Sequence, residues 1–178
     1  MKIAVSIVIL TLFLSSCNKK VDELPPATET GANTFGASVN GELWVPRAFG
    51  PITGAAILEA RFTSPTSIII QARNYASSPT ETEFEIFLND ITGPGTFQLN
   101  TTVPYPTTTA SYGYYVKRSV TPENEWITSS VYTGTVTITK LDAVNKIISG
   151  RFSFNAINLY NSPVPLTVTD GRFDIKIL

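Results

Sequence analysis

ISGRFSFNA, residues 148–156, alternates between apolar and polar side chains along almost its whole length. A period of two is the pattern of a β-strand with one face on the core and one face toward water. The preceding stretch, residues 131–141, alternates in the same way, with threonine at every second position from Thr133 to Thr139. Together the two stretches predict a β-hairpin.

The inward residues of both strands are even-numbered, and this parity constrains how the strands pair. Cross-strand partners must sum to an even number, and a sum of 288 pairs Val136 with Phe152 and Gly134 with Phe154. An even sum predicts an odd hairpin loop of about three or five residues, with a bulge. A loop of two or four residues would contradict this register.

Other segments also carry strand signals. Asn40-Gly41 favours a type I′ hairpin turn, which requires positive φ at both loop positions, and it places Ala37 opposite Trp44. The inward parity changes across Asp170-Gly171, which predicts a bulge or a turn there. Further strands are expected over residues 57–63, 67–74, 82–90, 96–100 and 166–177.

These segments predict an all-β fold, in which residues 33–178 form a single antiparallel domain of about eight to ten mostly hairpin-connected strands. A two-sheet sandwich or a flattened open barrel is the first expectation. The alternative is a closed up-and-down barrel of the calycin type with an interior cavity. Phe152 and Phe154 favour the sandwich, because such large side chains would plug a narrow barrel.

The composition excludes several classes of chemistry. The 178 residues include 13 Lys+Arg, 14 Asp+Glu and no His. Nucleic-acid binding is not expected, because it requires a clustered basic face. Without histidine, Ser-His-Asp and Cys-His catalysis and histidine-containing metal sites are excluded. The sequence therefore predicts no catalytic residue, no metal ligand and no cofactor.

Residues 1–17 have the organisation of a bacterial export signal. Lys2 precedes an apolar run, residues 3–13, that is too short to span a bilayer of about 30 Å as a helix. The run leads into Leu14-Ser15-Ser16-Cys17, which resembles the lipobox of bacterial lipoproteins. The resemblance implies that residues 1–16 are a signal peptide and that acyl chains on Cys17 anchor the protein in the lipid bilayer. An ordinary secretory signal with an incidental cysteine is the alternative.

Residues 17–32 are predicted to be the lipidated cysteine and a flexible tether. Pro25-Pro26 and the polar residues around them lack apolar periodicity. Asn18 follows the cysteine, where aspartate often retains Gram-negative lipoproteins in the inner membrane. By that analogy, we expect the protein in the cell envelope, anchored to the outer membrane, on a face that the sequence leaves open.

Aromatic residues gather in the irregular region after residue 101. Aromatic rings beside polar groups suit a surface that binds a glycan or a peptide. The alternative is a tyrosine-rich edge strand that packs over the sheet. The candidate ligand-binding residues are Tyr105, Tyr112, Tyr114, Tyr115 and Trp126.

Acidic residues at every second position from Glu81 to Glu85 are interpreted as a solvated sheet face, since same-face neighbours along a strand lie about 6.5–7 Å apart. A carboxylate-dependent hydrolase would need two acids about 5–9.5 Å apart in a cleft. The sequence nominates only Glu59, Glu83, Glu85 and Asp174 for that role.

Two groups of motifs carry a family resemblance. They are ISGRFSF at 148–154 with TDGRFD at 169–174, and NTFG at 33–36 with Asn40-Gly41 and WVP at 44–46. The chain resembles a family of uncharacterised Gram-negative lipoproteins that have a lipobox, a short tether and one domain of unknown function. The resemblance implies envelope location and a β fold, and it supplies no catalytic residue.

The first functional expectation is a non-enzymatic binding module of the envelope for a glycan, a peptide or an envelope protein. A purely structural or assembly role without a soluble ligand is the alternative, and a hydrolase is the less favoured third. The sequence leaves the oligomeric state open.

Overall fold

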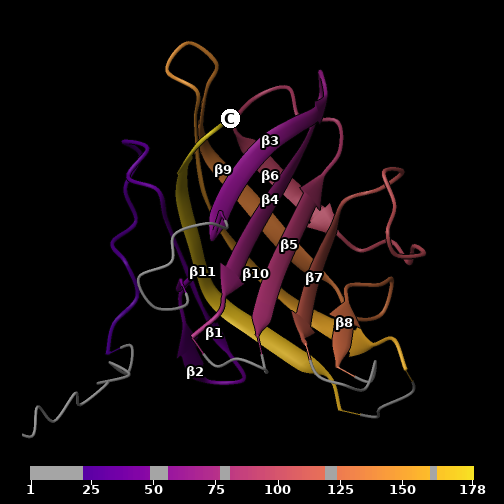
Figure 1. Cartoon of the computed structure of the whole chain (residues 1–178). Coiled ribbons are helices and arrows are strands. Elements are labelled where there is room, and N and C mark those ends of the chain that lie inside the picture. The colour runs from indigo at the N-terminus through magenta and orange to yellow at the C-terminus, as the bar shows by residue number, and fades with distance from the viewer. Residues whose placement is uncertain (1–21, 49–55, 77–80, 119–123, 161–163) are drawn as a thin grey trace, which may run out of the picture.

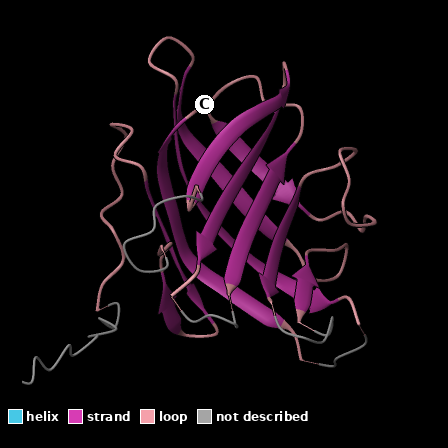
Figure 2. Ribbon diagram, viewed as in Figure 1, coloured by secondary structure: helices cyan, strands magenta, loops and turns pink. Residues whose placement is uncertain are grey.

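The computed structural model describes residues 22–48, 56–76, 81–118, 124–160 and 164–178. Every regular element in these residues is a β-strand (Figures 1 and 2). The predicted signal peptide, Cys17 and a turn expected at residues 77–79 lie outside them. The strands are β1 (Thr34–Val39), β2 (Glu42–Trp44), β3 (Leu58–Ser64), β4 (Ser67–Asn74), β5 (Thr82–Leu88), β6 (Gly95–Leu99), β7 (Tyr112–Lys117), β8 (Glu125–Ile127), β9 (Gly134–Asp142), β10 (Ile147–Asn158) and β11 (Leu166–Lys176).

The eleven strands form one antiparallel sheet in the order β2-β1-β11-β10-β8-β7-β5-β4-β3, and off this path β9 pairs with β10 and β6 pairs with β9. The sheet folds over on itself, so that β9 and β10 pass behind β4, β5 and β7 at an angle (Figure 1). The all-β prediction is confirmed, with one strand more than the expected range. Within the described residues the sheet ends at β2 and β3, which fits a sandwich or an open barrel and not the closed barrel.

β10 joins the two layers. Its first part, from Ile147 to Phe154, pairs with β9, whereas Ile157 and Asn158 pair with β8. Its other edge pairs with β11 from Ile147 to Ala156. One long strand therefore belongs to both layers, and the layer formed by β3, β4, β5, β7 and β8 is continuous with the layer behind it.

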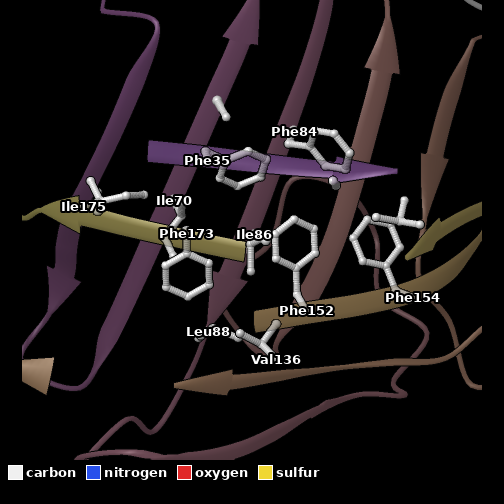
Figure 3. Packing of buried hydrophobic residues seen from close by; sticks show 14 of the residues in the cluster. Phe35, Ile70, Phe84, Ile86, Leu88, Val136, Phe152, Phe154, Phe173 and Ile175 are labelled. Carbon is white, nitrogen blue, oxygen red and sulfur yellow. The ribbon is translucent and has the colours of Figure 1, made fainter. Parts of the chain in front are cut away.

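The core lies between the layers and is rich in phenylalanine (Figure 3). Phe35 from β1 lies 5.4 Å from Phe84 of β5 and 5.2 Å from Phe152 of β10, measured between ring centroids. Ring pairs at such distances add about 0.5–1.5 kcal/mol each to the burial of apolar area. The residues that the alternation of β10 predicted to face inward, among them Phe152 and Phe154, are buried.

The predicted register of β9 and β10 is confirmed, but the predicted loop is wrong. Val136 pairs with Phe152 and Gly134 with Phe154. The hairpin nevertheless closes with Asp142 opposite Ile147, which leaves four loop residues instead of three or five. A bulge at the Ser149–Gly150 step shifts the sum of the paired residue numbers by one. A loop with an even number of residues is therefore compatible with the even sums of the pairs beyond the bulge.

Two other turn predictions are confirmed. Asn40 and Gly41 have φ values of 50° and 85°, and Ala37 lies opposite Trp44 across this hairpin. At Asp170, with φ of 55°, the register of β11 shifts against both β1 and β10. The parity change in the sequence therefore marks a bulge within one continuous strand.

The second half of the predicted tether differs from the expectation of a flexible segment. Leu24 and Pro25 lie against Gly36, where a Cβ atom would approach the Pro25 Cδ atom to 2.7 Å. Thr28 donates a hydrogen bond to the carboxylate of Asp174. Asp174 is buried, because the segment from Thr28 to Ala32 covers it.

Candidate functional site

The five aromatic candidates do not form one surface, because the sheet divides them between its two faces. Tyr115 points inward and lies 4.8 Å from Phe84, with Trp126 6.1 Å away on the same side. On the opposite face Tyr105 stacks on Tyr114 at a centroid distance of 3.9 Å, and Tyr112 lies beside them.

The tyrosines of β7 are largely buried, and the alternative of an edge strand is wrong. β7 lies between β5 and β8. The exposed fractions of Tyr112, Tyr114 and Tyr115 are 1%, 5% and 7%. Burial raises the pKa of Tyr115 to about 12. These side chains therefore pack rather than present rings to a ligand.

The acidic residues of β5 are part of a buried polar network and not of a solvated face. Glu85 accepts hydrogen bonds from the Tyr112 hydroxyl at 2.6 Å and from Gln71 Nε2 at 2.7 Å. Glu83 accepts from Arg73 at 3.2 Å and from Arg118 at 2.9 Å. The prediction of a solvated face failed because residues around Val103 and Tyr105 cover this side of β5 and β7.

Burial and the hydrogen bond to Glu85 raise the pKa of Tyr112 well above its usual value, so its hydroxyl remains a donor. Burial first, and then the hydrogen bond to Glu125, raise the pKa of Tyr114 in the same way. In the described part of the chain, no buried side-chain nitrogen or oxygen lacks a hydrogen-bond partner. A saturated network of this kind stabilises the layer.

The acids nominated for a hydrolase are engaged elsewhere. Glu59 lies 3.7 Å from Arg61 and 3.9 Å from Arg73. Asp174 is enclosed by the N-terminal segment, and none of the four nominated acids lines the large groove described next. Among the described residues, no group of three or more His, Cys, Asp or Glu side chains is placed to hold a metal ion.

The two free edges of the sheet approach each other along a seam. Arg47, just after β2, forms a parallel bridge with Asn74 of β4, in which the Arg47 amide donates to the Arg73 carbonyl at 3.1 Å. Further along, Ile177 bridges to Ala60 of β3, and the Leu178 amide donates to the Ala60 carbonyl at 2.9 Å. These two bridges tie the edges together without closing the barrel.

A groove of about 930 Å³ lies at this seam. Phe35, only 2% exposed, connects it to the core. Apolar side chains dominate its walls, and charged side chains from four positions join them. The lining residues are Asp22, Glu23, Leu24, Pro25, Pro26, Asn33, Thr34, Phe35, Val45, Pro46, Arg47, Ile57, Leu58, Lys176 and Leu178.

The groove was missed at the level of sequence because five separate segments build it. Pro25-Pro26 had been interpreted as part of a flexible tether, and Leu58 as part of a strand. No periodic pattern links these residues.

Residues 32–174 match the family model of a domain of unknown function, DUF6252. The chain belongs to the DUF6252 family. No curated protein and no solved structure matches it. The matched region includes the Phe35 floor of the groove, whereas the wall from Asp22 to Pro26 precedes it. In the described part of the chain, no helix has the length and apolar character to cross a membrane.

The DUF6252 domain also carries a broad polar surface on the outer face of β6, β9, β10 and β11. We call it the hydroxyl face, and its members include Thr96, Gln98, Thr135, Thr137, Arg151, Ser153, Asn155, Thr167, Thr169 and Arg172. One row runs from Arg172 through Arg151 and Thr137 to Thr96 across four strands. Two hollows of about 320 and 300 Å³ lie side by side on this face.

Proposed function

We propose that this protein is a lipid-anchored, non-enzymatic binding module of the bacterial envelope that captures an extended peptide or protein segment in the seam groove. The anchor rests on the lipobox-like end of the signal at Cys17. Acyl chains stabilise membrane attachment by about 0.8 kcal/mol per buried CH₂ group.

The seam groove is the observation that carries the binding function. Its walls combine prolines and aliphatic side chains with the charged groups of Arg47 and Lys176. Binding sites are typically concave and mostly apolar, with a small number of polar groups that fix orientation. An extended segment with apolar side chains fits such a groove better than a neutral sugar does.

The position of the groove suits a membrane-associated partner. Asp22 lines the groove, and Cys17 precedes it by five positions in the sequence. Five residues span at most about 18 Å when fully extended. A ligand held in the groove would therefore lie close to the lipid surface.

The anchor is tested by mass spectrometry of the mature N-terminus and by fractionation of cells that express Cys17→Ser. We expect an acylated Cys17 in the native protein and release of the variant into the soluble fraction. An acyl-free native N-terminus, or cleavage at another position, would refute the anchor.

The groove is tested by selecting peptides from a random phage-displayed library on the purified domain, residues 22–178. Leu58→Arg places a charge in the apolar wall, and Val144→Arg places the same charge on a hairpin loop where Val144 is 90% exposed. We expect Leu58→Arg to weaken the selected peptides about tenfold or more, which is about 1.4 kcal/mol. The control variant should bind as the original does.

Circular dichroism melting of both variants separates loss of binding from loss of folding. Equal peptide affinity of Leu58→Arg and the original protein would refute the groove as the site. Failure of the library to yield any binder would favour the second candidate function.

That second candidate is a structural or assembly role without a soluble ligand. The burial of Tyr112, Tyr114 and Tyr115 supports it, because the aromatic residues that suggested ligand binding serve the packing of the sheet. A hydrolase is not favoured, since the nominated acids hold arginine, tyrosine or backbone partners.

A further inference from the structure

Two arginines lie directly opposite each other on the hydroxyl face. Arg151 of β10 and Arg172 of β11 are cross-strand partners in the ladder. Partners in an antiparallel pair have Cα atoms about 4.5–5.5 Å apart, so both side chains project from one spot. Like charges at directly opposite positions destabilise a sheet, and such a pair therefore calls for a compensating charge.

The Asp170 carboxylate lines the same hollow as the two arginines, but among the described residues it forms no ion pair with either of them. Neither Arg151 nor Arg172 forms an ion pair in the described part of the chain, whereas Arg61, Arg73 and Arg118 each have a carboxylate within 3.9 Å. Arg172 Nε donates to the main-chain carbonyl of Asp170 at 3.2 Å, which holds this guanidinium over the hollow without neutralising it.

Hydroxyl groups surround the two guanidinium groups. The hollow of about 320 Å³ is lined by Thr135, Thr137 and Ser153 together with the arginines, and Phe152, Asp170 and Gly171 complete its lining. Thr135 and Ser153 also line the neighbouring hollow of about 300 Å³, which adds amide and hydroxyl groups of Gln98, Asn155 and Thr167. A hydroxyl both donates and accepts hydrogen bonds, which is the complement of a sugar hydroxyl.

We propose that the Arg151–Arg172 pair and its flanking hydroxyls bind an acidic saccharide. The oxyanion of the sugar, a carboxylate or a phosphate, lies between the two guanidinium groups. The planar fork of arginine matches both anions with paired hydrogen bonds. The sugar hydroxyls contact Thr135, Thr137 and Ser153. No residue of this site lines the seam groove, so it goes beyond the peptide-binding function.

The test is isothermal titration calorimetry of the purified mature protein with tetragalacturonate and with its methyl ester, which has the same sugar skeleton without charge. We expect the acid to bind at least about tenfold tighter than the ester. Arg151→Gln and Arg172→Gln should each weaken the acid about tenfold, because each removes charge-assisted hydrogen bonds to the anion. Arg61→Gln removes a guanidinium from the opposite layer and should leave the affinity unchanged.

Two further variants test the geometry. Arg151→Lys keeps the charge and loses the fork, so we expect an intermediate loss. Thr135→Val keeps the shape and removes the hydroxyl, so it should weaken the acid and the ester alike. Equal affinity of the Arg151→Gln/Arg172→Gln double variant and the original protein would overturn the proposal, and so would equal affinity for acid and ester.

A second arm compares glucose 6-phosphate, galacturonate and inorganic phosphate. The sugar that binds more tightly identifies the preferred anion. Either result supports the proposal when Arg151→Gln and Arg172→Gln both weaken the binding of that sugar. Inorganic phosphate binding as tightly as glucose 6-phosphate would overturn the role of the hydroxyls. Absence of binding by every acidic sugar would overturn the whole site.

Discussion

The Thr28 hydroxyl donates a 2.6 Å hydrogen bond to the Asp174 carboxylate, 146 residues further along the chain. Thr30, Gly31 and Ala32 add backbone donors at 2.9, 2.8 and 3.1 Å, and the Ser149 hydroxyl adds one at 2.8 Å. One buried carboxylate therefore joins the segment that precedes the domain to β10 and β11. The same segment continues back to Leu24 and Pro25, which form a wall of the groove.

Asp174→Asn should destabilise the domain strongly. The amide replaces one acceptor oxygen with a donor that faces the donors of Thr30, Gly31 and Ala32. Loss of a charged acceptor from a buried network predicts a decrease of about 2–4 kcal/mol in the free energy of unfolding. Urea unfolding measures it, with Asp170→Asn, which is exposed, as the matched control. A decrease below that of the control would show that the clamp contributes little.

The same carboxylate predicts an acid-dependent loss of stability. Burial favours the neutral form of Asp174, but hydrogen bonds from Thr28, Ala32, Ser149 and Thr30 outweigh it and hold the pKa well below its usual value. A lowered folded-state pKa stabilises the fold above the unfolded-state pKa, about 3.9, and this contribution is lost as the pH falls below it. The difference in unfolding free energy between the original protein and Asp174→Asn should be constant from pH 6 to 8 and shrink below about pH 4. A difference that persists unchanged at low pH would contradict the assignment to ionisation.

The sequence predicted the fold best where one face of a strand is buried and the other is wet. In residues 148–156 the alternation identified Phe152 and Phe154 as core, and parity then identified their partners. The loop prediction failed because parity constrains only the total number of unpaired residues in the loop and in any bulge, and not the length of the loop alone. A four-residue loop with a bulge near Ser149 satisfies the same register as an odd loop without one.

The sites were less predictable, because they depend on what covers each face. Glu83 and Glu85 show the same alternation as solvent-exposed residues, and nothing local reveals that Tyr105 and Val103 fold over them. The groove combines residues 22–26 with β1, with the residues after β2, with the start of β3 and with the residues around Ile177, which only the tertiary fold brings together. Arg151 and Arg172 stand on outward positions of adjacent strands and were detectable once the strand order was known.

Gly134→Ala should disrupt the pairing of small and large residues that the register of β9 and β10 creates. A Cβ atom at Gly134 would lie 2.2 Å from the Cβ atom of Phe154 and 2.5 Å from the Ser153 carbonyl oxygen. Overpacking of this kind costs about 1–3 kcal/mol. Gly93→Ala is the control, because nothing lies within 4 Å of its added Cβ. Thermal melts that place both variants at the same midpoint would refute the tight contact.

Tyr112→Phe distinguishes the structural role of the aromatic region from a ligand-binding one. The change removes only the hydroxyl that donates to Glu85 at 2.6 Å, and it leaves that buried carboxylate with Gln71 as its remaining side-chain partner. We expect a loss of about 1–3 kcal/mol in unfolding free energy, with no change in the affinity of groove-selected peptides. Tyr132→Phe is the matched control, since within the described residues the Tyr132 hydroxyl makes no hydrogen bond and its loss should be close to neutral. Weakened peptide binding by Tyr112→Phe at unchanged stability would instead return the aromatic region to the list of ligand sites.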